Sequence, residues 1–589
     1  MKKRYLPFLF ISAIAITSCT LFFGDSSYSK RINVYDIDRL DETNTLSSGF
    51  QKTLDVRFME GQDLIPYVTL SQYASLYDKH LQEGAKSEVS ESSYASSWTI
   101  SKDNQYYFAV LVSYYTGEIT VAGSIDAVYK EDDDPRDLKA LNYGLDVSSE
   151  GSTILSGTGY ATYSFYEYDI DYIRSGGKSY LPLSLFDITF SDTTSIYFTY
   201  NYKHILSTRD VENYSTKRYI DDGQEYTFDS QMVSSVYGLS LPNYLRDYNA
   251  SLFLYLMDHF YGLKNEKGIN SFETYYKSKG FYNGLFNYNG AARGQAYSDA
   301  LSLLDDGHTV LVSVNPCWGE SFSQRRKYST NMNERSKLAE TLKDYRSATY
   351  ASYNNSKAGK DILYSQDGKT ALFSFDSFEF GSTSQVFNDD DSIKETAKNY
   401  DTFFRILDVI NTIKNRGGVE NIVLDISING GGVIGVMLKL LALISKNNNG
   451  YVAMYQDTTT QLGIYNSKID INNDKTYDLD DCFGDEFNFY ILTSGYSYSC
   501  ANAFPCSAQV KGVAKIIGQQ SGGGECAVAI HYLPNSEYVY HSSNLHIGYY
   551  DETNKEFKGY ESGATPDIEI PVNENFYSIE SINAAIQNA

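Results

Sequence analysis

The sequence predicts an α/β chain: a β-rich N-terminal region, a helical segment and a C-terminal half in which strands and helices alternate. Three observations predict it. Short runs of Tyr, Thr, Val, Ile and Phe, broken by Gly, Asn and Asp, fill residues 31–215. Apolar residues then fall at helical spacing from about Leu241. From Asn421 onward a strand–loop–helix pattern repeats, which is typical of a mostly parallel sheet.

Length and charge limit the functions open to the chain. At 589 residues it exceeds the size of a single hydrophobic core, so several domains are expected. Apolar residues make up 42%, too much core material for a disordered chain. The formal net charge of −25 would repel nucleic acid and acidic lipid headgroups, so we expect no nucleic-acid partner.

The first 30 residues predict export. A basic start, Lys2-Lys3-Arg4, precedes an apolar stretch at residues 7–17 that is too short to span a bilayer. Ile16-Thr17-Ser18-Cys19 then resembles a bacterial lipobox. The resemblance implies a signal peptide at 1–18, and Cys19 acylated with palmitate-type chains at the head of a tether spanning 19–30. We therefore expect a lipoprotein of the cell envelope, held to the membrane by its lipid only; the alternative is an ordinary secretory signal with an incidental cysteine.

The β-rich region, residues 31–215, contains two segments that echo each other, at 64–70 and 179–185. They resemble the "tyr-(val/leu)-pro-leu" signature of a small β-rich repeat found beside copper amine oxidases and many Gram-positive surface enzymes. The helical segment, residues 240–390, is predicted from two helices. One starts around Leu252, and the other carries Tyr297, Ala300, Leu301 and Leu304 and ends near Asp305.

The C-terminal half, residues 391–589, opens with a predicted helix at 392–416 that Gly417 is placed to cap. Three buried-strand patterns follow at 421–427, 487–493 and 513–518, with helices predicted at 433–445 and around 500–510. In such a sheet the chemistry is expected at the carboxyl ends of the strands.

Three sites stand out at such strand ends or in short turns. They are Asp305-Asp306-Gly307-His308-Thr309, the loop Asn429-Gly430-Gly431-Gly432 and the turn before Ser499-Cys500. Ser499 stands where a strand turns into a helix, so its hydroxyl is expected over the helix N-terminus. The main-chain N–H groups of Cys500 and of Gly431 or Gly432 are placed to bind an oxyanion, and His308 would supply a general base.

Together these motifs resemble the tail-specific (C-terminal-processing) serine peptidases, in particular their tricorn-like branch. The matching segments are Asp306-Gly307-His308-Thr309, Leu424-Asp425 with Gly431-Gly432, 499–504 (SCANAF) and 563–567 (GATPD), all in the family order. The resemblance implies a crotonase-like ββα spiral peptidase core and hydrolysis of protein or peptide substrates. It also implies that Ser499 is the nucleophile, His308 the base and a late glutamate, assigned to Glu561, its orienting partner.

The chain departs from the family at several points. Ser427 replaces an arginine that usually follows the strand. The turn at 521–525 (SGGGE) lacks the lysine of the serine–lysine branch, and Lys511 and Lys515 lie in the wrong segment. No "gly-leu-gly" loop of a PDZ module is found between His308 and Asn421. Cys500 as a thiol nucleophile is disfavoured because Ser499 occupies the nucleophile position.

Metal chemistry has one weak candidate, and we expect no cofactor otherwise. Residues 470–481 (DINNDKTYDLDD) place oxygen ligands at the positions of a calcium loop: Asp470, Asn472, Asp474, Thr476, Asp478 and Asp481. Lys475 stands where such loops carry glycine, and the last ligand is Asp rather than Glu. The alternative is a plain Asx-rich loop. His531, His541 and His546 are expected to be structural or surface residues.

These observations predict a lipid-anchored extracytoplasmic serine endopeptidase with a Ser-His-Glu mechanism. The chief alternative is a non-enzyme, a lipoprotein with a decayed peptidase fold that binds peptides or glycans. A third possibility is that the β-rich region is the functional binder and the peptidase trims its partners.

Overall fold

The computed structural model describes residues 27–37, 50–124, 128, 145–146, 153–157, 159–194, 196–209, 218–221, 224–227, 240–313, 330–390, 392–472, 474–535 and 537–589. The predicted signal segment and Cys19 lie outside these residues. Within the described ranges, none of the helices has the length and apolar character needed to cross a membrane.

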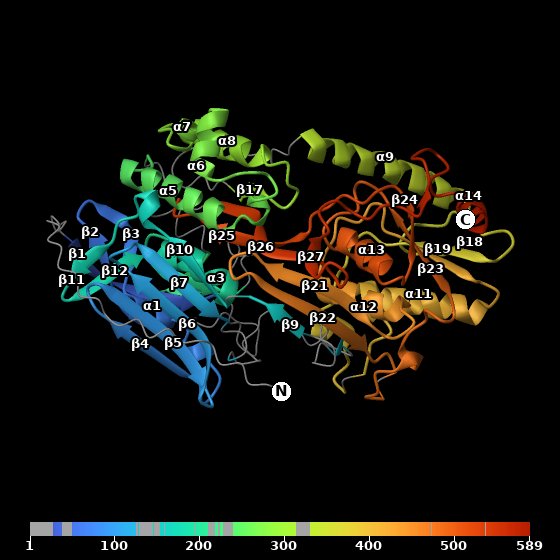
Figure 1. Cartoon of the computed structure of the whole chain (residues 1–589), viewed down its shortest axis with the longest axis horizontal. Coiled ribbons are helices and arrows are strands. Elements are labelled where there is room, and N and C mark those ends of the chain that lie inside the picture. The colour runs from blue at the N-terminus through green and yellow to red at the C-terminus, as the bar shows by residue number, and fades with distance from the viewer. Residues whose placement is uncertain are drawn as a thin grey trace.

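The N-terminal region is built from two sheets and a hairpin (Figure 1). The seven-stranded sheet has the order β11 (Ile173–Ser175), β12 (Lys178–Pro182), β3 (Gln62–Val68), β2 (Phe50–Met59), β1 (Ser27–Asp36), β14 (Ile205–Thr208), β13 (Tyr197–Tyr200). The five-stranded sheet has the order β10 (Tyr160–Ser164), β7 (Glu118–Gly123), β6 (Gln105–Ser113), β5 (Ala95–Lys102), β4 (Lys86–Glu91). The hairpin pairs β15 (Arg218–Asp221) with β16 (Gln224–Thr227). The strand-rich prediction is confirmed, although β1 starts inside the expected tether.

The two echoing segments form equivalent units. In each, a strand runs into a helix: β3 leads to α1 (Leu70–Ala74), and β12 leads to α3 (Leu183–Thr194). The two strands pair with each other in antiparallel fashion, with Leu181 opposite Val68. The sequence similarity therefore reflects a local structural repeat within one sheet.

The helical segment lies beside the N-terminal sheets and extends over the C-terminal half (Figure 1). It comprises α5 (Asn243–Phe260), α6 (Phe272–Lys279), α7 (Tyr282–Leu285), α8 (Gly290–Ser302) and α9 (Thr330–Ser352). Both predicted helices are present as α5 and α8. The second ends at Ser302, short of Asp305, which adopts a left-handed conformation with φ 48°.

A third sheet joins the N-terminal and C-terminal parts. Its main path is β17 (Val310–Ser313), β26 (Tyr538–Asp551), β21 (Gly450–Gln456), β22 (Gln461–Ile469), β8 (Leu145–Asp146), with β25 (Cys526–Tyr532), β27 (Glu556–Gly559) and β9 (Thr153–Ser156) attached. Residues of β25 and β26 share one apolar core with the N-terminal sheets and α5–α8. The N-terminal and C-terminal halves are therefore packed together. The segments predicted from the sequence did not indicate this shared core.

The C-terminal half is built around a six-stranded sheet. Its order is β18 (Leu363–Tyr364), β19 (Thr370–Ser374), β20 (Asn421–Asp425), β23 (Asn488–Thr493), β24 (Lys515–Gly518), β28 (Ile568–Glu569), and all neighbours from β19 onward are parallel. The predicted α/β class and alternating pattern are confirmed. The sheet starts before residue 391, however, because β18 and β19 belong to it.

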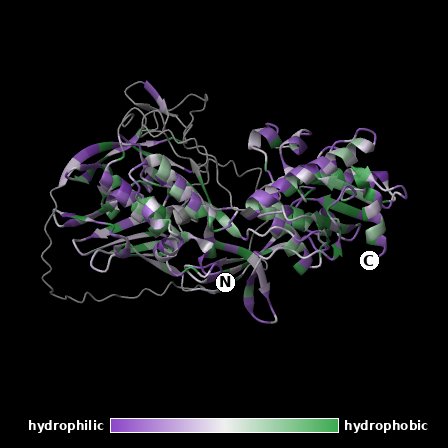
Figure 2. Cartoon of the chain, turned by 90° about the horizontal axis from the view of Figure 1, so that it is seen from above, coloured by the Kyte–Doolittle hydropathy of each residue, from purple (hydrophilic) through white to green (hydrophobic). Residues whose placement is uncertain are grey.

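Helices cover both faces of this sheet. In β20, Ile422 and Leu424 face the cluster around α11 (Thr402–Arg416), α12 (Ile434–Ile444) and α13 (Cys500–Val510), whereas Val423 faces the cluster around α9 and α14 (Ile579–Gln587). Burial on both faces explains why the strand reads as a continuous apolar run. Figure 2 shows hydrophobic strands at the centre of this half.

The helix predicted at 392–416 starts later than expected. The Asp401 carboxylate accepts the main-chain N–H groups of Phe403 and Phe404, so α11 starts at Thr402, and Gly417 follows its last turn with φ 74° as predicted. The short helix α10 (Thr383–Val386) precedes it.

Candidate active site

Ser499 lies in the turn between β23 and α13. Its backbone is in the left-handed region, with φ 58° and ψ −127°, which is strained for serine and is typical of functional positions. The Ser499 N–H donates to the Gly523 carbonyl at 3.0 Å. Its hydroxyl caps no main-chain group and makes no hydrogen bond with a described residue. A free hydroxyl therefore stands at the N-terminus of α13, as predicted.

The glycine loop after β20 lies directly against Ser499. A Cβ built on Gly431, where φ is 115°, would lie 2.7 Å from the Ser499 Cβ and 3.1 Å from its Oγ. Only glycine permits this approach. The Gly431 N–H donates to Asn429 Oδ1 at 2.8 Å, so it is already occupied. The N–H groups of Gly432 and Cys500 have no acceptor among the described residues, so both remain available as donors.

His308 is held beside the residue that precedes Ser499. Its ring contacts the Tyr498 ring edge-on, with centroids 4.9 Å apart. Asp306 accepts the His308 N–H at 3.0 Å and the Tyr498 hydroxyl at 3.3 Å, which ties the two segments together. Burial lowers the pKa of His308, while Asp306 opposes this effect, so the ring is neutral at pH 7. Its Nδ1 is buried without a partner in the described part of the chain. No hydrogen bond joins His308 to Ser499 or Glu561.

Glu561 is hydrogen-bonded to the glycine turn at 521–525, and the same turn is hydrogen-bonded to Ser499. One carboxylate oxygen accepts the N–H groups of Gly524 and Glu525, each at 3.0 Å. Burial raises the pKa of Glu561. Because Gly523 in the same turn binds the Ser499 N–H, this turn positions both Ser499 and Glu561.

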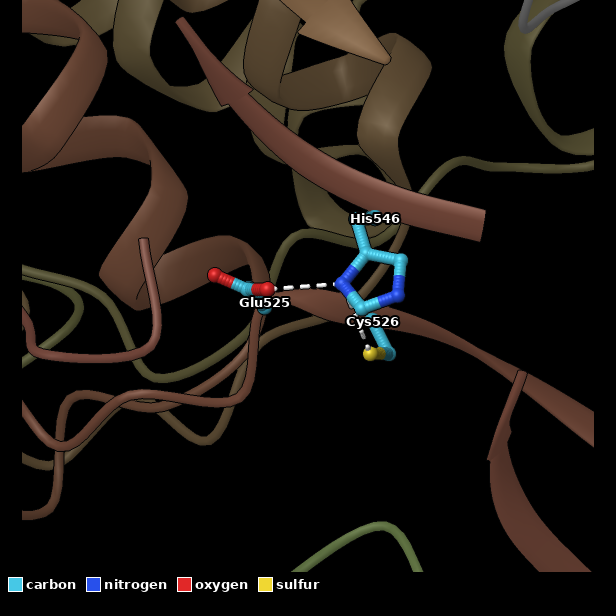
Figure 3. Close-up of side chains that lie close together, drawn as sticks. All are labelled: Glu525, Cys526 and His546. Carbon is cyan, nitrogen blue, oxygen red and sulfur yellow. Dashed lines mark hydrogen bonds and ion pairs between the residues drawn. The ribbon is translucent and has the colours of Figure 1, made fainter. Parts of the chain in front are cut away.

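Sequence reasoning missed a buried pair behind Glu561. Glu525 accepts the Glu561 N–H at 2.7 Å and a hydrogen bond from His546 Nδ1 at 2.7 Å (Figure 3). Burial lowers the pKa of His546, but hydrogen bonds with Asp457, Cys526 and Glu525 outweigh it and raise the pKa well above its ordinary value. These hydrogen bonds favour the protonated form of His546 beside Glu525. In the ranges that the structure describes, only Glu525, Cys526 and His546 bring three possible histidine, cysteine or acidic ligand atoms within 4.8 Å of one another.

The arginine missing after β20 is supplied from another element. Arg346 of α9 lies 3.5 Å from the fully buried carboxylate of Asp425 and forms two hydrogen bonds with Asp376, at 2.7 and 2.6 Å. Ser427 instead donates its hydroxyl to Asp425 at 2.6 Å. Helix α9 was not predicted from the sequence, and no motif in residues 330–352 pointed to Arg346.

The remaining candidates lie away from this site or outside the described residues. Cys19 is outside them. His531 and His541 form a buried pair, with 3.0 Å between Nδ1 and Nε2, which agrees with a structural role. The 470–481 loop lies between β22 and β23, and Cys482, Cys500, Cys506 and Cys526 are free thiols.

A serine hydroxyl at a strand–helix turn, beside a glycine loop with available N–H donors, is the arrangement that acyl-transfer chemistry uses. Comparison with known protein families indicates which class of hydrolase the chain is similar to. Residues 391–570 match the model of Peptidase family S41. This match supports the predicted resemblance to tail-specific and tricorn-like peptidases, and it supports a serine-type peptidase.

Several solved structures are similar at low identity. A Parabacteroides merdae protein described as a peptidase is 19% identical, with 54% of this chain and 88% of that chain covered and a TM-score of 0.37. Mature CPAF complexed with lactacystin is 12% identical, with 59% and 99% covered and a TM-score of 0.36. The photosystem II D1 C-terminal processing protease is 12% identical, with 36% and 46% covered and a TM-score of 0.25. Similarities this weak carry no argument of their own. No curated protein matches the chain.

Proposed function

We propose that the protein is a lipid-anchored extracytoplasmic serine endopeptidase that hydrolyses protein or peptide substrates through Ser499, His308 and Glu561. The observation that carries the proposal is the unbonded Ser499 hydroxyl packed against Gly431, at the N-terminus of α13. A substrate carbonyl placed there would meet the Gly432 and Cys500 N–H donors and the positive end of the helix dipole.

The reaction follows from these groups. His308 takes the proton of Ser499 as its Oγ bonds to the substrate carbonyl carbon, and the oxyanion forms between the two N–H donors. His308 then gives that proton to the leaving amine as the peptide bond breaks, and water hydrolyses the acyl-enzyme by the same route in reverse. Glu561 would stabilise the protonated imidazole. The His308–Ser499 hydrogen bond is absent here, and such bonds often form only when substrate binds.

The cleavage of an unfolded protein substrate tests this proposal. Ser499→Ala is expected to lower the cleavage rate by roughly 10³-fold or more. Cys500→Ala is the matched control, because burial raises the pKa of the Cys500 thiol to about 12 and leaves it protonated at neutral pH. Retained cleavage in Ser499→Ala would contradict the assignment.

One observation favours the alternative of a decayed peptidase that binds peptides. The His308 ring packs against Tyr498, and no hydrogen bond joins it to Ser499. If that arrangement were fixed, the hydroxyl would have no base, and the wild-type protein would bind an unfolded chain without cleaving it. The same assay separates the two functions.

The anchor is a separate part of the proposal and rests on the lipobox-like residues 16–19. Acylation of Cys19 would hold the protein in the cell envelope although its charge repels lipid headgroups. Cys19→Ser should move the protein from the membrane fraction to the soluble fraction and abolish incorporation of labelled palmitate. Unchanged fractionation would contradict the anchor.

A further inference from the structure

The loop at residues 470–481 lies outside the catalytic site and carries a pattern that the peptidase function does not use. It connects β22 of the third sheet with β23 of the peptidase core, by way of the short 3₁₀ helix η9 (Leu479–Asp481). Oxygen-bearing residues occur at its first, third, fifth, seventh, ninth and twelfth positions.

Two main-chain contacts and one backbone angle among the described residues of the loop match those of a calcium loop. The Lys475 N–H, at the sixth position, donates to Asp470 Oδ2 at 3.0 Å, and Lys475 has φ 66°. This left-handed residue makes the sharp turn for which such loops use glycine. Asp481, at the twelfth position, folds back and accepts the Ile471 N–H at 2.8 Å. The first and last positions therefore lie close together.

A buried carboxylate provides a second, independent observation. Asp470 is 6% exposed, and its Oδ1 is buried with no partner among the described residues. Asp481 is fully buried, and its two carboxylate oxygens accept the N–H groups of Ile471 and Asp478, at 2.8 and 3.1 Å. Two buried carboxylates with an unpaired oxygen are costly unless a charge compensates them. Lys475 is the sole basic residue in the loop, and its side chain is exposed.

We propose that this loop binds one Ca²⁺ ion. The side chains of Asp470, Asn472, Asp474 and Asp481 and the Thr476 carbonyl would be ligands, with Asp478 acting through a water. The donors are all oxygens, which favours a hard cation over zinc. The loop's carboxylates are not gathered within 4.8 Å of one another, so binding would draw the exposed Asp474 and Asp478 toward the buried pair.

Calcium would stabilise the junction between the third sheet and the core. Asn448, just after α12, donates its Nδ2 to the carbonyls of Ile469 and Asp478, at 2.7 and 3.1 Å. Both ends of the loop are thus fixed to the peptidase core. An ion inside the loop would link β22 to β23, and its removal should lower the melting temperature of the protein.

Calorimetric titration of the purified full-length protein with CaCl₂, after treatment with a chelator, tests the proposal. We expect one site per chain, in the range of about 10⁻⁴–10⁻³ M found for extracellular calcium modules, and weaker binding of Mg²⁺. Asp474→Ala, at an exposed ligand position, should abolish binding without unfolding the protein. Asp480→Ala is the matched control, because this neighbouring exposed carboxylate is not a ligand and binding should persist.

A gain of affinity provides a second, independent readout. Lys475→Gly keeps the left-handed turn and removes a positive charge beside the ion, so it should tighten Ca²⁺ binding about tenfold. No saturable heat up to about 10 mM Ca²⁺, well above that affinity range, would overturn the proposal. Equal binding by wild type and Asp474→Ala would overturn it as well.

Discussion

At the scale of single residues, the site depends on how closely main chain approaches the nucleophile. Gly431 presses against Ser499 with a backbone conformation that L side chains rarely adopt, whereas its neighbour Gly430 has no atom nearer than 3.9 Å to an added Cβ. The two glycines look alike in sequence. Their different roles follow from the packing of β20 against the 494–499 turn.

Gly431→Ala should therefore lower kcat/KM by roughly 100-fold, because a displacement of about 1 Å at the nucleophile costs that much. Gly430→Ala is the matched control and should retain near wild-type activity. The measurement is steady-state cleavage of a peptide substrate by both folded variants. Equal losses in the two variants would show that Gly431 has no special contact with Ser499.

Some site residues were predictable and others were not. Ser499 and the glycine loop stand at the ends of strongly apolar strands, so the parallel-sheet pattern alone places them at one edge. Arg346 and the Glu525–His546 pair depend on long-range packing between elements far apart in sequence. The sequence around Arg346 or His546 does not indicate which distant carboxylate each of them contacts.

At the scale of elements, the glycine turn at 521–525 connects the nucleophile with Glu561, and Glu525 at its end is fixed by His546. Given the Ser-His-Glu mechanism, Glu525→Gln should lower kcat about tenfold, equivalent to about 1.4 kcal/mol, with little change in KM. Glu556→Gln, on nearby β27 in an exposed pair with Lys558 at 2.6 Å, is the control. An unchanged kcat in Glu525→Gln would show that Glu525 does not position the catalytic residues.

Helix α9 supplies the charge that balances Asp425. Arg346→Met would leave this fully buried carboxylate without its cation and should lower the free energy of unfolding by about 3–5 kcal/mol. The exposed pair Lys398–Asp408, 3.0 Å apart, is the matched case, and Lys398→Met should cost less than about 1 kcal/mol. Urea unfolding of both variants measures the difference, and similar losses would contradict a stabilising role for the buried pair.

At the scale of the whole molecule, the α/β class and the order of segments were predictable, but the way they share cores was not. Strands β8 and β9 come from the N-terminal half and pair with β22 of the C-terminal half. Short strands in turn-rich sequence carry no signal for so distant a partner. The tyrosine-rich sheets and the peptidase core therefore form one packed body rather than separable modules.

This packing buries histidines and should make the fold sensitive to acid. Burial lowers the pKa of His531 to about 3, whereas the unfolded chain would titrate near 6.5. As pH falls from about 6.5 toward 3, the unfolded state binds the proton and the folded state does not, so stability falls by at most about 1.4 kcal/mol per pH unit. Denaturant titrations at pH 7.5 and 5.0 should show a smaller loss for His531→Gln than for wild type. Identical losses would contradict this account.

The central claim is that Ser499 is an activated nucleophile, and covalent labelling by a fluorophosphonate tests it most directly. The wild-type protein should react, and peptide mapping should locate the adduct on Ser499, while Ser499→Ala should remain unlabelled and Cys500→Ala should label normally. A folded wild-type protein that fails to react, or an adduct on another residue, would contradict the account.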